Sequence, residues 1–313
     1  MKNDKKTVSV VVPIYNEISL LEEIYDRISN VFKNLDNYIY EIIFFDDGST
    51  DGTRKGIEEM CQKHEEVKAV FYSKNFGYLK NTFYCFQQAK GDCAIIVHAD
   101  LQNPPELIPE FLEKWEKGAQ VVLGVKNKSR ENKFIYFLRT VFYFLMNTVF
   151  GVNLIPHATE FELFDKSFIE ILKGIKTNTP FLRGIVNEYA SSIDCVYYTQ
   201  DARKKGKSKF NLNKYYDFAI CGITQYSACL PRRIIACSII ALALLFIESC
   251  FVILSNIGNM DLLSIANSVI IRCILAAICI LTIIVCVIFE YIISIKNNTV
   301  EKPLIIEEKR INY

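Results

Sequence analysis

Three polar side chains with possible metal-binding chemistry follow a short apolar run in the first third of the chain. His98, Asp100 and Gln102 come after residues 93–97, and two consecutive prolines end the segment. A fully apolar run is typical of a buried parallel strand. Alternate residues of an extended chain point to one side, so the three side chains are expected to share a face. An imidazole, a carboxylate and an amide oxygen could together hold Mg²⁺ or Mn²⁺. The alternative is a polar strand end that caps the following helix.

The elements that must position these groups alternate along the chain. Apolar, β-branched runs predict strands, and apolar residues at helical spacing predict helices between them. The expected strands are 7–12, 40–45, 67–72, the run from 93, 120–125 and 196–199, and the expected helices are 20–32, 54–64, 79–88 and 107–115. This alternation predicts an α/β, Rossmann-like, mostly parallel sheet with right-handed crossovers. Ligands of such sheets bind beyond the carboxyl ends of the strands.

A dense basic segment lies close to the end of the predicted α/β region. It contains Arg203, Lys207 and Lys209 around a single glycine, Gly206. Guanidinium and ammonium groups on a loop could clamp phosphates. The alternative is a solvated run of charge with no ligand.

Two long apolar stretches dominate the last third of the chain. Residues 234–254 and 269–295 each exceed the roughly 20 residues that a membrane-spanning helix needs. The residues between them include no Lys or Arg, whereas basic residues flank the outer ends of both stretches. The positive-inside rule therefore predicts that both termini and the α/β domain are cytoplasmic.

The expected organisation is an α/β domain over residues 1–230, a two-helix transmembrane hairpin over 231–295 and a cytoplasmic tail over 296–313. Two segments of the first domain, near 132–152 and 211–230, are expected to lie at the bilayer interface. The first of them is rich in Phe and Tyr with basic residues among them, which is typical of an interfacial helix. A buried core helix is the alternative.

Composition narrows the class of protein further. The net charge of +1 over 313 residues argues against a nucleic-acid surface, and the 51% hydrophobic content indicates a membrane segment. The 11 cysteines are scattered without CxxC spacing, so neither a zinc knuckle nor a thioredoxin-like site is expected, and a reducing compartment is indicated. The amino terminus lacks the long apolar run of a signal peptide.

Several short motifs occur in an order that resembles a known family. They are Val12-Pro13-Ile14-Tyr15-Asn16-Glu17, Asp46-Asp47-Gly48-Ser49, Asn75-Phe76-Gly77, Asp100-Leu101-Gln102 and Gly206-Lys207-Ser208-Lys209-Phe210. With the two apolar stretches, they resemble the family 2 inverting glycosyltransferases of GT-A fold. The most similar subgroup is the polyprenyl-phosphate glycosyltransferases, which include dolichol-phosphate mannose synthases and bactoprenol glucosyltransferases.

The resemblance implies a reaction and a location. It implies transfer of a hexose from a nucleotide sugar, with a UDP-sugar favoured, to polyprenyl (undecaprenyl) phosphate. A divalent cation, Mg²⁺ or Mn²⁺, would neutralise the leaving diphosphate. The acceptor phosphate is already anionic, so no strong general base is needed. The implied location is the bacterial cytoplasmic (inner) membrane, with a homo-oligomeric enzyme.

The resemblance also implies roles for individual residues. Nucleotide-sugar binding falls to Pro13, Tyr15, Glu17, Asp46, Asp47, Asn75, Gly77 and Asp100. The metal ligands would be Asp100, Gln102 and His98. The phosphate-binding residues would be Arg130, Arg203, Lys207 and Lys209, and the catalytic ones Asp100, Arg203 and Glu160.

The chain departs from the family pattern at several of these positions. His98 stands where the family usually has Asp, Asn103 replaces another Asp, and Tyr78 stands where a Lys often follows the Asn-Phe-Gly motif. The family's Gly-Asp-Phe-Arg-Leu corresponds to Thr159-Glu160-Phe161-Glu162-Leu163, in which Glu160 could replace Asp and Glu162 reverses a charge. Two alternatives therefore stand beside the main reading. One is a family 2 transferase that acts on a polysaccharide or teichoic-acid chain, and the other is a catalytically silent scaffold subunit.

Overall fold

A mixed β-sheet forms the centre of the α/β domain in the computed structural model. The structure describes residues 5–129, 140–152, 154–200, 212–227, 229–255, 262–300 and 302–313. Within these residues the sheet has the strand order β7-β5-β6-β4-β1-β2-β3-β8. Its strands are β1 (Lys6–Ile14), β2 (Tyr38–Asp46), β3 (Val67–Tyr72), β4 (Cys93–Ile96), β5 (Val121–Ser129), β6 (Ala158–Asp165), β7 (Ile193–Gln200) and β8 (Glu307–Ile311).

Most neighbouring strands run parallel. β1 pairs in parallel with β2 and with β4, β2 with β3, and β5 with β7. β6 is antiparallel to both β4 and β5, and β8 is antiparallel to β3. The predicted α/β, mostly parallel sheet is confirmed. Because β4, β1, β2 and β3 run parallel, their carboxyl ends lie on the same side of the sheet. The polar motifs lie at these carboxyl ends.

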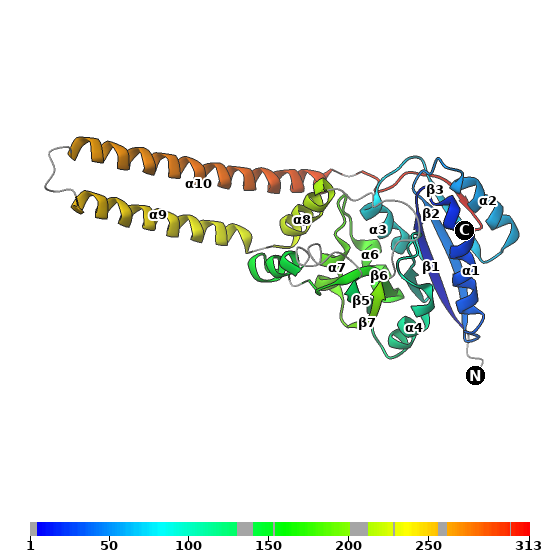
Figure 1. Ribbon diagram of the computed structural model, residues 1–313. Coiled ribbons are helices and arrows are strands. Elements are labelled where there is room, and N and C mark those ends of the chain that lie inside the picture. Colours follow the sequence, from blue (N-terminus) through cyan, green and yellow to red (C-terminus); the bar gives the residue numbers. More distant parts are fainter. Residues whose placement is uncertain are drawn as a thin grey trace.

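Helices cover both faces of the sheet (Figure 1). On one face lie α1 (Leu21–Phe32), α2 (Thr53–Lys63) and α4 (Ile108–Glu116), whose apolar residues join the first core cluster. On the other lie α3 (Tyr78–Gln88), α6 (Lys166–Gly174) and α7 (Leu182–Tyr189), whose apolar residues join the second. The sheet is therefore sandwiched, and its central strands must be apolar on both sides.

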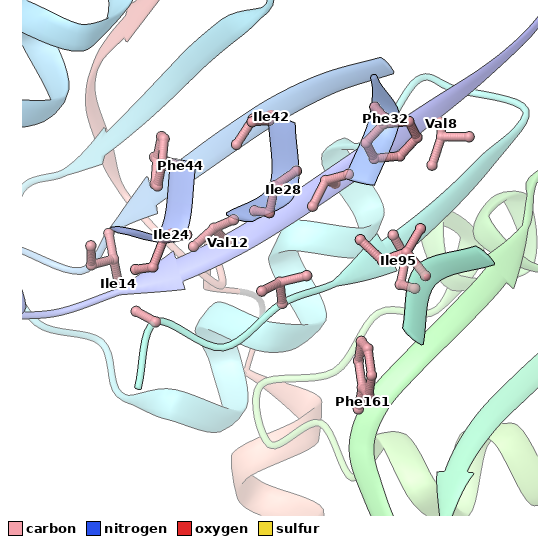
Figure 2. Close-up of a cluster of buried hydrophobic side chains, with 14 of the residues drawn as sticks. Val8, Val12, Ile14, Ile24, Ile28, Phe32, Ile42, Phe44, Ile95 and Phe161 are labelled. Atoms are coloured by element: carbon pink, nitrogen blue, oxygen red, sulfur yellow. The ribbon is translucent and has the colours of Figure 1, made fainter. Parts of the chain in front are cut away.

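Strand β1 shows how the sequence satisfies both faces. Val10 and Val12 belong to the first cluster, whereas Val11 belongs to the second, and all three are fully buried. Figure 2 shows Val12 packed beside Ile24 and Ile28 of α1, with Phe44 and Ile42 of the neighbouring strand. Alternate residues of β1 face opposite helical layers, and this is why the strand is apolar at successive positions.

The chain after β4 differs from the extended course expected from sequence. The strand ends at Ile96, and the amide of Leu101 donates to the carbonyl of His98 at 3.1 Å, which closes a turn. Leu101 has φ +53° and its side chain is 1% exposed in the first core cluster. Burial of this leucine holds the backbone in a turn, so the expectation that His98, Asp100 and Gln102 alternate along one extended face was wrong.

The segment expected to form an interfacial helix lies partly outside the described residues. Residues 140–149 are helical, and their last part is the π-helical η3 (Leu145–Val149). Tyr143 and Met146 pack with Phe181 in a third cluster, while Phe144 is 60% exposed. The helix therefore has a buried face and an exposed apolar residue, and its place at a bilayer interface stays a prediction.

Two long apolar helices project from the domain as a hairpin (Figure 1). A shorter helix, α8 (Leu212–Tyr226), leads to α9 (Leu230–Ser255), and α10 (Leu262–Thr299) returns. Residues Leu230–Val252 and Val269–Thr299 have mean hydropathies of 2.5 and 3.0 and are long and apolar enough to cross a bilayer. Their large side chains are exposed, as Phe246 at 70% shows. An exposed apolar surface of this extent fits contact with lipid.

The chain beyond α10 rejoins the sheet. Strand β8 pairs with β3, with Val70 opposite Arg310, and the amide of Ser73 donates to the carbonyl of Ile306 at 3.0 Å. Sequence analysis assigned residues 296–313 to a tail, whereas Glu307–Ile311 is an edge strand of the sheet. The α/β domain is thus built from chain on both sides of the hairpin. Near the carboxyl end, Asn312 donates to the carbonyls of Cys61 in α2 and Val67 in β3 (Figure 1).

Candidate active site

Asp46 ends β2 and is completely buried at the edge of the sheet. Its Oδ1 accepts a hydrogen bond from the amide of Ser49 at 3.2 Å, and its Oδ2 lies 3.4 Å from Nε of Arg54. Burial raises the pKa of Asp46, and the contacts with Ser49 and Arg54 oppose that rise. Arg54 also donates to the carbonyl of Tyr72 at 3.0 Å. A buried carboxylate held on several sides can present a fixed acceptor to a polar ligand.

The neighbouring Asp47 organises the loop after β3. Its Oδ1 accepts from the amide of Phe76 at 2.6 Å and its Oδ2 from the amide of Gly77 at 3.0 Å. Burial raises its pKa to about 6, against these two hydrogen bonds. Gly48 allows the close approach, because a Cβ there would lie 2.7 Å from the carbonyl carbon of Lys74. Asp47 is 3% exposed, so its contribution to a ligand site is to shape the loop.

The loop after β1 is bound to the loop after β2. The amide of Asn16 donates to Oγ of Ser49 at 2.9 Å, and Oδ1 of Asn16 accepts from the amide of Thr50 at 2.7 Å. The amide of Glu17 donates to Oγ1 of Thr53 at 3.0 Å. These bonds explain the positive φ of +54° at Asn16, a residue that tolerates the left-handed region.

Together these bonds bring most of the predicted nucleotide-sugar residues to one edge. The loops that carry Tyr15, Glu17, Asp46, Asp47, Asn75 and Gly77 are joined directly by hydrogen bonds. Pro13 is buried within β1, Tyr15 and Glu17 are half-buried, and Asn75 is exposed. The site thus combines a rigid buried base with exposed polar groups at its surface.

Asp100 lies in the turn after β4 and is partly exposed. Its Oδ1 accepts from the amide of Gln102 at 3.1 Å, and no hydrogen bond to its Oδ2 occurs within the described residues. His98 makes its contacts through Nε2, which lies 2.9 Å from the carbonyl oxygen of Glu160. In the part of the chain that the structure describes, no three His, Cys, Asp or Glu side chains are grouped closely enough to hold a metal ion alone.

The donor set nevertheless fits a cation shared with a ligand. Mg²⁺ is commonly held by one or two carboxylates, with substrate phosphates and water completing the shell. Asp100 supplies such a carboxylate oxygen, and an imidazole nitrogen of His98 is an acceptable ligand for Mn²⁺. The side chains present are therefore compatible with a divalent cation bridged to a diphosphate.

A buried acidic cluster lies behind this turn, on β6 and α7. The hydroxyl of Tyr78 donates to Oε2 of Glu160, and Nη2 of Arg183 lies 3.7 Å from Oε1 of the same carboxylate. Nη1 of Arg183 donates to the hydroxyl of Tyr143 at 2.9 Å. Sequence analysis gave Glu160 a catalytic role, but the structure engages its carboxylate with side chains of two helical segments. That arrangement is suited to positioning neighbouring groups.

Glu162 is the most deeply buried member of the cluster, with 1% of its surface exposed. Burial raises its pKa to about 8; the charge of Glu160 acts in the same direction, and Arg183 opposes it. A cavity of about 20 Å³, which Glu162 and Arg183 help to line, lies beside it. That volume is about one water molecule. When Glu162 is protonated, Arg183 faces the Glu160 side chain without a second acidic charge beside it.

Two residues of this region were missed in the sequence. Arg54 and Arg183 each lie in the first two positions of a helix and reach side chains that are distant in sequence. Nothing in their local context indicated those contacts, which depend on how helices pack on the sheet. The predicted phosphate-binding residues Arg130, Arg203, Lys207 and Lys209 lie outside the described residues.

The fold and the position of the site define a class of protein. The chain superposes on mannosyl-3-phosphoglycerate synthase from Rubrobacter xylanophilus with a TM-score of 0.52 and 15% identity, over 69% of this chain and 71% of that one. It superposes on glucosyl-3-phosphoglycerate synthase from Mycobacterium tuberculosis, solved with Mn²⁺, UDP and phosphoglyceric acid, with a TM-score of 0.50 and 18% identity, over 70% and 76%. The domain has the GT-A fold of glycosyltransferases.

The family is narrower than the fold. Residues 9–190 match the model of glycosyl transferase family 2, so the chain belongs to that family and is a glycosyltransferase.

The chain is also similar in sequence to several glycosyltransferases. The chain is 33% identical over 220 residues to the uncharacterized glycosyltransferase YkcC of Bacillus subtilis, covering 70% of this chain and 68% of the relative. It is 30% identical over 256 residues to a prophage bactoprenol glucosyl transferase homolog of Escherichia coli, covering 80% and 83%. It is 31% identical over 228 residues to a bactoprenol glucosyl transferase of Shigella phage SfV, covering 72% and 74%.

Proposed function

We propose that this glycosyltransferase moves a hexose from a nucleotide sugar to polyprenyl phosphate, with inversion at the transferred carbon. One observation carries the proposal. The sheet edge that bears the polar loops and the apolar hairpin belong to a single folded unit, because the chain leaves the domain through α8 and returns to it as β8. An active site so anchored is suited to an acceptor whose phosphate lies at a membrane surface and whose tail lies within the bilayer.

The donor would bind across the joined loops at the carboxyl ends of β1, β2 and β3. Asp46 would accept from the base, and the exposed parts of Tyr15 and Glu17 would flank the base and ribose. A UDP-hexose is favoured, because relatives at about 30% identity are named bactoprenol glucosyl transferases. A fold neighbour was also solved with UDP.

Asp100 would hold a divalent cation, Mg²⁺ or Mn²⁺, with Gln102 and His98 beside it. When bound, such an ion supplies positive charge that stabilises the departing nucleoside diphosphate. Asp100 itself orients the turn through its bond to Gln102. The acceptor phosphate is ionised at neutral pH, so positioning of the two phosphates accounts for most of the work asked of the protein.

The residues proposed to bind the acceptor phosphate lie outside the described part of the chain. Arg130, Arg203, Lys207 and Lys209 are proposed to bind phosphate because guanidinium and ammonium groups suit phosphate oxygens. We place the domain and both termini on the cytoplasmic side of a bacterial inner membrane, with a homo-oligomer as the working assembly. The positive-inside distribution of Lys and Arg supports the orientation.

Transfer of label into lipid tests the proposal. Membranes containing the protein are incubated with polyprenyl phosphate and a panel of labelled UDP- and GDP-sugars, and the organic phase is counted and analysed by mass. Label in the organic phase with one donor is expected, and Asp100→Asn membranes are the matched control. Label that enters only polymer would favour a polysaccharide or teichoic-acid acceptor. No incorporation from any donor would favour a silent scaffold.

A further inference from the structure

Three of the positions at which the sequence departs from the family pattern lie in one contact network. Tyr78 comes from α3, His98 from the turn after β4, and Glu160 from β6. The Tyr78 hydroxyl donates to Glu160 and also lies 3.3 Å from Nε2 of His98. Nε2 of His98 lies 2.9 Å from the carbonyl oxygen of Glu160. These three residues come from different elements of the domain and contact one another.

The partners of His98 determine which ring nitrogen carries the proton. A carbonyl oxygen can only accept a hydrogen bond, so Nε2 must donate to Glu160. The Tyr78 proton is already directed at the Glu160 carboxylate, so the phenol oxygen can also accept from Nε2. An imidazole that carries its single proton on Nε2 has its lone pair on Nδ1.

No hydrogen bond to Nδ1 of His98 occurs among the residues that the structure describes. A ring nitrogen in this state can ligate a cation, and ligating histidines usually donate their other N–H to a carbonyl or carboxylate. His98 already makes that second contact. In the same turn it lies two residues before Asp100, the carboxylate proposed to hold the cation.

The arrangement depends on the guanidinium group of an arginine in α7. Arg183 lies 3.7 Å from the Glu160 carboxylate, contacts the hydroxyl of Tyr143, and lines the cavity beside Glu162. Only 20% of its side chain is exposed. Without a guanidinium there, the Glu160 carboxylate would be left partly buried beside a second acidic group, which is costly. The Glu160 side chain would then be expected to break its hydrogen bond with Tyr78 and rotate into solvent.

We infer that Arg183 is a positioning residue for the donor site: it holds Glu160, and Glu160 with Tyr78 fixes His98 as the Nε2–H tautomer with Nδ1 offered to a divalent cation. The inference rests on the proposed function for the identity of that cation. It gives three of the departures from the family pattern, Tyr78, His98 and Glu160, a common purpose, since each contacts the other two.

The histidine ring nitrogens provide a test that needs neither donor nor turnover. The chain has three histidines, so ¹⁵N-histidine labelling of the full-length protein in detergent gives few ring signals. His98→Gln identifies the signals of residue 98. We expect the pattern of a fixed Nε2–H tautomer at His98. An Nδ1–H pattern, or the averaged pattern of a free imidazole, would overturn the inference.

Variants separate positioning from general stability. Arg183→Gln should convert His98 to the averaged pattern, and Arg183→Lys, which keeps a positive charge, should retain the fixed one. Arg310→Gln is the matched control, because Arg310 pairs with Glu307 at the opposite end of the sheet. If Arg183→Gln does not fold, Tyr78→Phe removes a single hydroxyl and should release His98 in the same way. A fixed tautomer in both variants would contradict the assignment.

Mn²⁺ alone is the probe for the cation. At substoichiometric concentration it should broaden the ring signals of His98 and spare those of His64, which bonds to Tyr25 near the end of α2. Equal broadening of both histidines, or none at His98, would overturn the role given to Nδ1. A wild-type protein with both expected signatures but no sugar transfer would support this inference and refute the proposed reaction, so the two can fail separately.

Discussion

At the scale of single residues, the acidic side chains of this site divide by environment. Asp46 and Asp47 are buried, and their carboxylate oxygens accept hydrogen bonds from protein donors. Asp100 is partly exposed and accepts a single hydrogen bond within the described residues. A carboxylate that is buried and already bonded to protein donors is closed to a hydrated cation, whereas a partly exposed carboxylate can reach one. This difference is why we propose Asp100, rather than Asp46 or Asp47, as the carboxylate that holds the cation.

The first prediction concerns Asp100. Asp100→Asn keeps the size of the side chain and removes its charge, so it should retain the turn but lose the cation. A loss of about 3 kcal/mol of transition-state stabilisation corresponds to roughly a hundredfold fall in kcat. Steady-state kinetics with the donor and the metal varied measure it. Asp194→Asn on β7, which breaks a partly exposed pair with Lys114 of α4, is the control and should be near wild type. A folded Asp100→Asn enzyme with ordinary turnover would remove Asp100 from the site.

The second prediction concerns Glu162 and pH. Its pKa is raised from 4.5 to about 8 in the folded protein. Its contribution to stability is therefore fully present below about pH 4.5 and is lost as pH rises through 8. Glu162→Gln removes this dependence. Between pH 6 and 8 the variant should gain about 2 kcal/mol relative to wild type, by linkage.

Thermal unfolding in detergent at several pH values measures this gain. The difference in Tm between Glu162→Gln and wild type should widen by several degrees from pH 6 to pH 8. Glu113→Gln on α4 is the control, because Glu113 is exposed and paired with Lys117, and its Tm difference should stay constant. A difference that stays constant from pH 6 to pH 8 would mean that Glu162 is ionised in the folded protein, with Arg183 as its counterion.

At the scale of elements, the sheet and its carboxyl edge could be predicted because local pattern decides them. Residues 67–72 were expected as a strand and form β3, and 79–88 were expected as a helix and form α3 with one further residue. The turn after β4 could not be predicted, because it depends on Leu101 being drawn into the core. The site loops follow from motifs, but their joining through Asn16 and Asp47 depends on strand order.

Strands β6 and β8 show where local pattern fails. β6 was noted as a motif but not as a strand, and its antiparallel place between β4 and β5 requires contacts with chain far away in sequence. β8 is short and contains four charged residues, Glu307, Glu308, Lys309 and Arg310, which indicates a solvated tail when read alone. An edge strand exposes one side, so charge is no obstacle to it.

The third prediction concerns β8. Deletion of residues 305–313 should lower Tm, since it removes the buried Ile305 and uncovers the edge of β3. Loss of one buried large aliphatic side chain alone costs about 2–5 kcal/mol. Deletion should also raise KM for the nucleotide sugar, because Arg54, which lies 3.4 Å from Asp46, is paired with Glu308 at 3.0 Å.

Glu308→Gln separates the two effects. Glu308 is more than half exposed, so its pair with Arg54 contributes at most about 1 kcal/mol and Tm should hardly change. Differential scanning fluorimetry and donor kinetics on the full-length variants give both readouts. A deletion variant with unchanged Tm would show that β8 is not docked on the sheet.

At the scale of the whole molecule, the lengths of α9 and α10 can be compared with the thickness of a bilayer. At about 1.5 Å per residue, α9 extends roughly 39 Å and α10 roughly 57 Å, which exceeds the roughly 30 Å hydrocarbon core. Glu248 of α9 and Arg272 of α10 lie 3.8 Å apart within these helices. Charges at membrane depth are expected to pair, and this one joins the two spans.

The pairing of β8 with β3 constrains topology. Residues on both sides of the hairpin build one sheet, so α9 and α10 must cross any membrane as a pair and return the chain to the side from which it left. We propose that this side is cytoplasmic, in line with the positive-inside distribution of Lys and Arg. The far end of the hairpin would then face outward.

The last prediction tests this topology with single cysteines in a background in which the 11 native cysteines are replaced. Ser255→Cys, at the end of α9, should react with an impermeant thiol reagent in intact cells. Glu65→Cys, exposed between α2 and β3, and Lys302→Cys, exposed after α10, should react only after the cells are opened. The reverse pattern would place the donor site outside the cell, away from nucleotide sugars. Labelling of Lys302→Cys together with Ser255→Cys in intact cells would mean a single crossing, which the shared sheet forbids.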